Sequence, residues 1–193
     1  MEAAALIFDC DGTLADTMPI HYLAWRTTLE RYRIQFDEDR FYALGGCPPA
    51  KIVKMLADEQ QVTVDALAVA EEKESCFLAS LGQVLPITPV VDVARAHHGR
   101  LPMGVGSGSG RDIVRDILQR LGIAQLFQCV VGSEDTEHHK PEPDVFLRVA
   151  SLLGVAPQAC CVYEDSDLGI EAARRAGMQW FDVRTVHTPK RWT

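Results

Sequence analysis

The stretch FDCDGT, residues 8–13, carries two aspartates two positions apart, Asp9 and Asp11, directly after a short apolar run. The apolar run predicts a buried strand over residues 4–8, and Gly12 predicts a turn directly after it. Two carboxylates at the end of a strand can divide a reaction between them, because one can attack an electrophile while the other transfers protons. Asp11, free of the strand, suits the proton-transfer role.

Three other predicted strands end in polar residues. Ser107 follows the second strand in a glycine-rich loop, Lys140 follows the third, and Glu164 and Asp165 follow the fourth. Each signal alone also fits an ordinary turn or a solvated loop. Because the carboxyl ends of parallel strands meet at one edge of a sheet, the whole set is expected to converge there.

The chemistry of this set is mutually consistent. Several carboxylates can share one cleft as anions only if a cation neutralises them, and Mg²⁺ prefers such hard oxygen ligands. A lysine and a hydroxyl supply hydrogen-bond donors for phosphoryl oxygens. The sequence therefore predicts phosphoryl transfer through an aspartyl-phosphate, with Mg²⁺ as cofactor.

The elements that must position these residues read as an α/β fold. Short apolar runs alternate with helical patterns from residue 85 onward, which is typical of a parallel sheet. The expected strands are residues 4–8, 103–105, 128–131, 160–163 and 180–183, and the expected helices between them are residues 88–96 (capped by Thr88), 112–121, 144–153 and 168–176.

The alternation disappears between residues 16 and 84. Helical patterns there cover residues 21–32, 37–44, 49–59 and 65–81. An insertion after the first strand lies at the edge where open α/β sheets bind ligands, so it can act as a lid. We expect residues 1–15 and 85–193 to form the α/β core and residues 16–84 to form a helical cap.

Composition restricts the partners. A net charge of −8 and a pI near 5.2 oppose general binding to nucleic acid or to an anionic membrane, although a basic stretch, residues 187–193, is expected to be exposed. No apolar stretch approaches membrane-spanning length, and the N-terminus lacks the pattern of a signal peptide. The six cysteines form no C-x-x-C pair, which favours reduced thiols in a cytoplasmic protein.

Four ordered motifs, DCDGTLADT, VGSGS, HKPEPDVF and YEDSDLGIEAARRAGM, resemble those of the haloacid dehalogenase-like (HAD) hydrolase superfamily. HYLAW, EDSDLGI and the position of the insertion resemble its β-phosphoglucomutase-like branch, especially bacterial fructose-1-phosphate and 6-phosphogluconate phosphatases. The resemblance implies a Rossmann-like core with a small helical cap. It also implies roles for individual residues: Asp9 as nucleophile and metal ligand, Asp11 as acid/base and as metal ligand through its backbone carbonyl, Glu164 and Asp165 as further Mg²⁺ ligands, and Ser107, Gly108 and Lys140 as phosphate-binding residues.

Within the cap, the resemblance places His21 and Lys73 near the acid/base aspartate or the substrate, and Gly45 and Gly46 in a substrate loop. The residues themselves also allow a structural role for His21. Lys73 lies in a charged run, residues 71–74, which also fits a solvated helix face.

The predicted function is Mg²⁺-dependent hydrolysis of small sugar phosphates, with a phosphorylated metabolite as partner and no prediction of oligomeric state. β-Phosphoglucomutase is the main alternative. Where the similar mutases carry a cap arginine and a lysine for the distal phosphate, this chain has Pro49 and Gly110, but Lys51 and Arg111 lie close by in sequence. A phospho-receiver-like signalling module or a non-catalytic protein is a more distant alternative than the mutase. A carbon–halogen hydrolase is disfavoured because it would need no aspartate at position 11.

Overall fold

The computed structural model describes residues 3–45 and 47–192. Its centre is a parallel sheet of five strands in the order β3-β2-β1-β4-β5, with β1 in the middle. The strands are β1 (Ala5–Phe8), β2 (Met103–Gly106), β3 (Cys129–Val131), β4 (Cys160–Glu164) and β5 (Gln179–Asp182). All five strands expected from the sequence are present, and the α/β fold class is confirmed.

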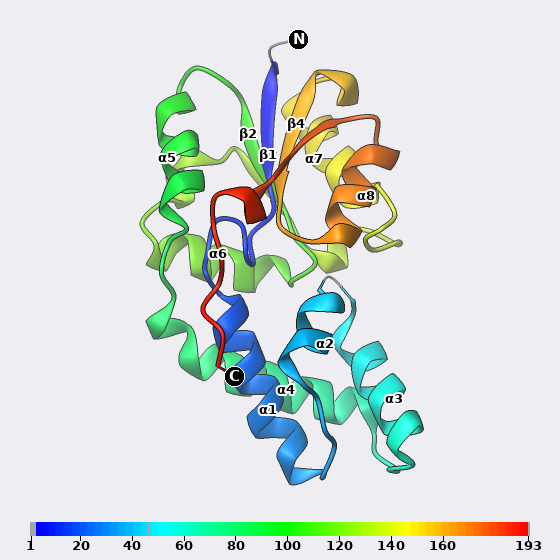
Figure 1. Ribbon diagram of the computed structural model, residues 1–193. Coiled ribbons are helices and arrows are strands. Elements are labelled where there is room, and N and C mark those ends of the chain that lie inside the picture. Colours follow the sequence, from blue (N-terminus) through cyan, green and yellow to red (C-terminus); the bar gives the residue numbers. More distant parts are fainter. Residues whose placement is uncertain (1–2, 46, 193) are drawn as a thin grey trace.

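Alternating residues of β1 face the two sides of the sheet and belong to two different hydrophobic clusters. Leu6 and Phe8 join α5 (Thr88–His97) and α6 (Arg111–Arg120), whereas Ala5 and Ile7 join α7 (Asp144–Leu153) and α8 (Asp167–Arg175). Both faces of the sheet are therefore covered by helices, as Figure 1 shows, and β1 is buried along its whole length.

The helix ends follow local sequence rules. α7 stops at Gly154, whose φ of +69° suits the left-handed cap that glycine adopts readily, and α8 begins after Ser166, whose side chain accepts from the Gly169 N–H. At α5 the structure differs from the sequence expectation, because Ile87 is the cap residue and Thr88 is the first residue of the helix. Short 3₁₀ segments are η1 (Leu81–Gln83), η2 (Ala124–Leu126), η3 (Ser133–Asp135), η4 (Pro157–Ala159) and η5 (Val183–Thr185).

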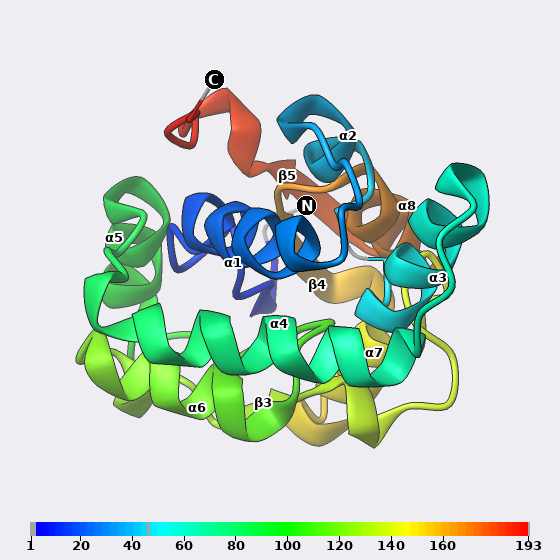
Figure 2. The same ribbon diagram turned by 90° about the horizontal axis from the view of Figure 1, so that it is seen from below.

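A separate group of helices lies beyond the carboxyl end of β1 (Figures 1 and 2). It consists of α1 (Met18–Arg31), α2 (Glu38–Ala43), α3 (Pro49–Gln60) and α4 (Ala66–Ser80). This helical group has a hydrophobic cluster of its own, built around Trp25, Phe41 and Leu56. The two chain segments that connect it to the sheet are hydrogen-bonded side by side, with the Asp16 N–H donating to the Leu85 carbonyl at 2.9 Å.

Within the described residues, no helix has the length and apolar character needed to cross a membrane. The six cysteines are free thiols, and Cys10 and Cys160 are buried.

Candidate active site

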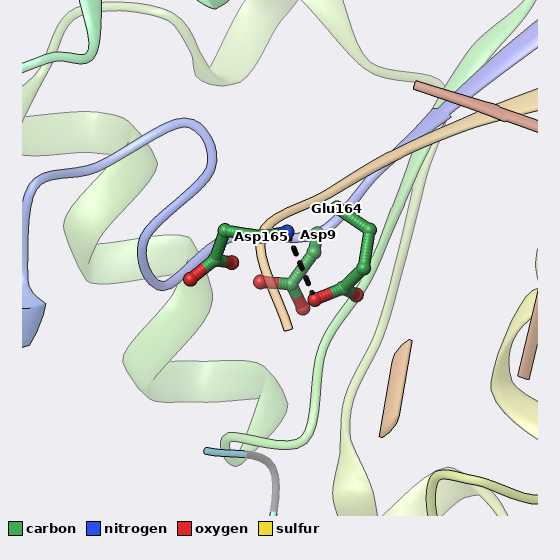
Figure 3. A group of neighbouring side chains, drawn as sticks. All are labelled: Asp9, Glu164 and Asp165. Atoms are coloured by element: carbon green, nitrogen blue, oxygen red, sulfur yellow. Dashed lines mark hydrogen bonds between the residues drawn. The ribbon is translucent and has the colours of Figure 1, made fainter. Parts of the chain in front are cut away.

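The structure brings Asp9, Glu164 and Asp165 together at the carboxyl ends of β1 and β4. One carboxylate oxygen from each residue lies within 4.8 Å of the others (Figure 3). Lys140 joins them, because its Nζ donates to Asp9 Oδ1 at 2.6 Å and to Glu164 Oε2 at 2.7 Å. Lys140, Asp9 and Glu164 are buried, so these ion pairs are shielded from water.

The three carboxylates carry more negative charge than one lysine balances. Burial and the neighbouring carboxylates raise the pKa of Asp9 well above its usual value, although Lys140 opposes this shift. Burial, followed by the Glu164 charge, raises the pKa of Asp165 to about 8. A divalent cation among these oxygens would relieve the repulsion, so the donor set fits a hard metal ion.

Glu164 is held by the start of α8. Its Oε1 accepts from the Ser166 hydroxyl at 2.8 Å and from the Ser166 backbone N–H at 3.0 Å. Gly169, one turn into the helix, lies against the same carboxyl group, and a Cβ added there would sit 2.0 Å from Glu164 Cδ. Glycine at position 169 therefore leaves the space that the Glu164 carboxylate occupies.

Asp11 lies outside the three-carboxylate cluster, and its side chain is oriented by hydroxyl groups. Thr17 donates to Oδ1 at 2.7 Å and Ser109 donates to Oδ2 at 2.7 Å, with Ser107 farther away at 3.5 Å. Burial raises the pKa of Asp11, but the hydrogen bonds from His21, Ser109 and Thr17 outweigh it and lower the pKa below the usual value. The group is therefore ionised at neutral pH.

His21 connects Asp11 to Lys73. Lys73 Nζ lies 2.8 Å from His21 Nδ1, and His21 Nε2 lies 3.3 Å from Asp11 Oδ1. An ammonium group can only donate, so His21 Nδ1 accepts and Nε2 carries the proton toward Asp11. Burial and the Lys73 charge lower the pKa of His21. Lys73 is 3% exposed, which contradicts the solvated-face interpretation of its charged run.

A cavity of about 940 Å³ connects these groups, between the sheet edge and the helical group. Its lining includes the predicted residues Asp9, Asp11, His21, Gly45, Lys73, Ser107, Gly108, Lys140, Glu164 and Asp165. Gly46 lies outside the described residues. Neither Lys51 nor Arg111 is among the lining residues, and Arg111 is paired with Asp135 at 2.6 Å.

Sequence reasoning missed four residues that hold the site together. Thr17 and Ser109 orient Asp11, while Ser166 and Gly169 support Glu164. All four lie within the motifs quoted from the sequence, and Ser109 and Ser166 directly follow the predicted site residues Gly108 and Asp165. Thr17 precedes α1 but makes no side-chain cap to it, so helix-capping rules do not reveal its contact with Asp11.

A family model described as haloacid dehalogenase-like hydrolase matches residues 6–183. The chain belongs to this family. Membership confirms the predicted family and the prediction of an enzyme, a hydrolase. Each of the four motifs quoted from the sequence contributes residues to the cavity lining, among them Asp9, Ser107, Lys140 and Glu164.

Relatives within the HAD family include fructose-1-phosphate phosphatase YqaB of Escherichia coli, which is 44% identical over 95% of this chain and 97% of its own length. A phosphorylated carbohydrates phosphatase of Thermotoga maritima is 29% identical over 91% of this chain and 82% of its own. Among solved structures, β-phosphoglucomutase of Clostridium difficile superimposes with a TM-score of 0.80 at 26% identity, over 93% of this chain and 84% of that chain.

Proposed function

We propose that this protein is a phosphatase that hydrolyses small sugar phosphates through an aspartyl-phosphate formed on Asp9. The observation that carries the proposal is the contrast between the two aspartates at the end of β1. Asp9 lies with Lys140 in the buried carboxylate cluster, whereas Asp11 is held outside it, ionised, by hydroxyl donors. The sugar-phosphate phosphatases among the relatives support the same substrate class.

In the first half of the reaction, an Asp9 carboxylate oxygen attacks phosphorus and the bond from phosphorus to the sugar oxygen breaks. A phosphate dianion beside Asp11 raises the proton affinity of that carboxyl group, so Asp11 can deliver a proton to the departing oxygen. In the second half, Asp11 takes a proton from water, the water attacks phosphorus, and the Asp9 carboxylate is regenerated as phosphate leaves.

Asp9, Glu164 and Asp165 would hold Mg²⁺, with the backbone carbonyl of Asp11 as the further ligand that the family resemblance implies. The ion would supply positive charge that neutralises these carboxylates and the phosphoryl oxygens. Lys140, Ser107 and the loop at Gly108 would supply donors to the phosphoryl group, because all three line the cavity.

Residues 16–84 would act as a cap that closes over the phosphoryl group. Gly45, Lys73 and His21 all come from this segment and face the same cavity as Asp9. We propose substrate contact for Gly45 and Gly46, and for Lys73 a role through His21 in orienting Asp11, since Lys73 Nζ contacts the His21 ring. Enclosure by the cap would exclude bulk water until the leaving group departs.

The phosphomutase alternative needs cations for a second phosphate. Pro49 and Gly110 occupy the positions where similar mutases carry such cations, and the nearby Lys51 and Arg111 do not line the cavity. Two arginines that do line it, Arg184 and Arg191, are paired with Asp182 at 2.8 Å and with Asp39 at 3.1 Å, which supports hydrolysis over mutase activity. The receiver-like and non-catalytic alternatives lack support, because the relatives named above are enzymes that act on phosphorylated carbohydrates.

The test is release of inorganic phosphate from a panel of sugar phosphates that begins with fructose 1-phosphate, with Mg²⁺ present. We expect wild-type turnover, loss of turnover in Asp9→Asn, and wild-type rates in the control Asp112→Asn, which changes an exposed aspartate of α6. Rapid quenching followed by peptide mass spectrometry should locate the phosphoryl group on Asp9. Persistent turnover in Asp9→Asn contradicts the proposed nucleophile, and conversion of β-glucose 1-phosphate mainly to glucose 6-phosphate supports the mutase instead.

A further inference from the structure

The C-terminal segment leaves the sheet after η5 and runs along the helical group. Figure 1 shows this segment in red, passing from β5 down to the side of α1, and Figure 2 shows it near α2. We call residues 187–192 the strap. The sequence predicts an exposed basic stretch here, and the side chains of Arg191 and Trp192 are indeed partly exposed, but their contacts anchor the strap to α1 and α2.

The strongest anchor is a buried carboxylate. Glu38, in the first turn of α2, is 1% exposed, and its two oxygens accept from the Trp192 backbone N–H at 2.9 and 3.1 Å. A hydrogen bond to an ionised group is stronger than one between neutral groups, and burial increases the cost of losing it. The Trp192 indole N–H also donates to the Pro19 carbonyl of α1 at 3.2 Å.

Arg191 supplies a second anchor on α2. Its guanidinium pairs with Asp39 at 3.1 Å and lies 3.9 Å from the centre of the Tyr42 ring. A guanidinium stacked over an aromatic face is an attractive contact. Nearer the sheet, His187 Nε2 lies 3.4 Å from Asp16 Oδ1, beside the connection between β1 and α1. The strap therefore lies beside the connection at its first residue and against α1 and α2 at its last two.

The anchored helix forms part of the substrate cavity. α2 spans only six residues, so its first turn at Glu38 is rigidly linked to Tyr42 and Ala43, which line the cavity. The loop that follows α2 comes close to the core, since a Cβ on Gly45 would lie 3.7 Å from the Ser166 Cβ. The strap itself contributes His187 and Arg191 to the cavity lining.

We propose that the strap is a specificity-determining element: by holding α2 against the core, it sets the shape of the cavity wall that meets the sugar. The proposal rests on the proposed phosphatase function for its substrate class. Arg191 and Trp192 act as positioning residues, because they hold α2 in place, while the phosphoryl chemistry occurs at Asp9. Loss of the strap then harms substrates that fill the cavity more than a small aryl phosphate that needs little of the far wall.

The test is a chain truncated after Lys190, together with the point variants Arg191→Ala and Trp192→Phe. The matched control is Arg120→Ala, which breaks an exposed pair with Asp116 on α6, because Arg120 and Arg191 have similar exposed fractions of 46% and 40%. We expect the ratio of kcat/KM for the preferred sugar phosphate to that for p-nitrophenyl phosphate to fall about tenfold in the truncated chain, mainly through a higher KM, as expected for a coupling of ordinary size. The point variants should show smaller falls.

Hydrogen exchange of the α2 backbone amides gives a readout that does not depend on turnover. Exchange should be faster in the truncated chain than in wild type and unchanged in Arg120→Ala. Unchanged α2 exchange after truncation overturns the proposal, as does faster exchange with an unaltered substrate ratio. If the wild-type protein hydrolyses no phosphomonoester, the proposed function fails instead, and the exchange result still decides whether the strap anchors α2.

Discussion

Replacing Gly169 with alanine tests whether the space beside Gly169 is needed to hold the Glu164 carboxylate in place. In most helices this change stabilises the fold by about 1 kcal/mol, because alanine has the higher helix propensity. Here the new Cβ would lie 2.0 Å from Glu164 Cδ and 2.1 Å from Glu164 Oε2. The carboxyl group must therefore move by more than about 1 Å to reach ordinary van der Waals contact.

Glu164 accepts hydrogen bonds from Lys140 at 2.7 Å and from the Ser166 hydroxyl at 2.8 Å. A shift of this size breaks both, because it lengthens the donor–acceptor distances beyond hydrogen-bonding range. Each bond to a charged group contributes about 1.5–3 kcal/mol. After subtraction of the propensity gain, Gly169→Ala should lower the free energy of unfolding by about 2–5 kcal/mol. Because Glu164 also belongs to the proposed metal site, the Mg²⁺ concentration for half-maximal activity should rise about 10- to 100-fold.

The assays are urea unfolding without metal and a Mg²⁺ titration of phosphate release. The control is Gly82→Ala in η1, where an added Cβ meets nothing within 4 Å. The reasoning is refuted if Gly169→Ala is as stable as the Gly82→Ala control and shows the wild-type dependence on Mg²⁺.

Other substitutions and conditions test the remaining parts of the site. Asp11→Asn should slow phosphate release by about 10²- to 10⁴-fold, the usual size of general acid–base catalysis, and stopped-flow measurement of both half-reactions should show each one slowed. Exhaustive chelation should abolish activity, and Ca²⁺ in place of Mg²⁺ should inhibit because its larger, looser coordination shell misplaces the nucleophile; full activity after chelation would contradict the metal assignment. Lys73→Met should reduce turnover of sugar phosphates more than that of p-nitrophenyl phosphate, because p-nitrophenolate departs with little need of a proton from Asp11, which Lys73 orients through His21; equal losses would contradict this role. The hydrogen bond with Asp144 raises the pKa of His138. This pair therefore stabilises the fold below the unfolded-state pKa of histidine, and the stabilisation is lost as the pH rises through the folded-state pKa. An NMR titration should show a lower pKa for His138 in Asp144→Asn than in wild type.

Local patterns were sufficient to predict the sheet and the residues at its edge. β1 is a buried run followed by a glycine turn. Hydrophobic periodicity, with glycines such as Gly154 after α7, placed the helix bounds within three residues of the observed ones. Because parallel strands share one carboxyl edge, the placement of Asp9, Ser107 and Glu164 follows from the strands that they end or directly follow. Lys140 comes nine residues after the end of β3, so its place beside Asp9 depends on the path of the loop as well.

Tertiary structure decided the contacts between segments that are far apart in the chain. From the sequence, Lys73 belongs to a charged helix face. In the fold, its ammonium group contacts the ring of His21, which is 52 residues away in the chain. Glu38 and Trp192 are 154 residues apart, and no periodic pattern predicts that a terminal backbone N–H will satisfy a buried carboxylate. Hydrophobic periodicity and capping report the state of neighbouring residues only, whereas burial of a charge depends on which distant groups the packed fold places beside it.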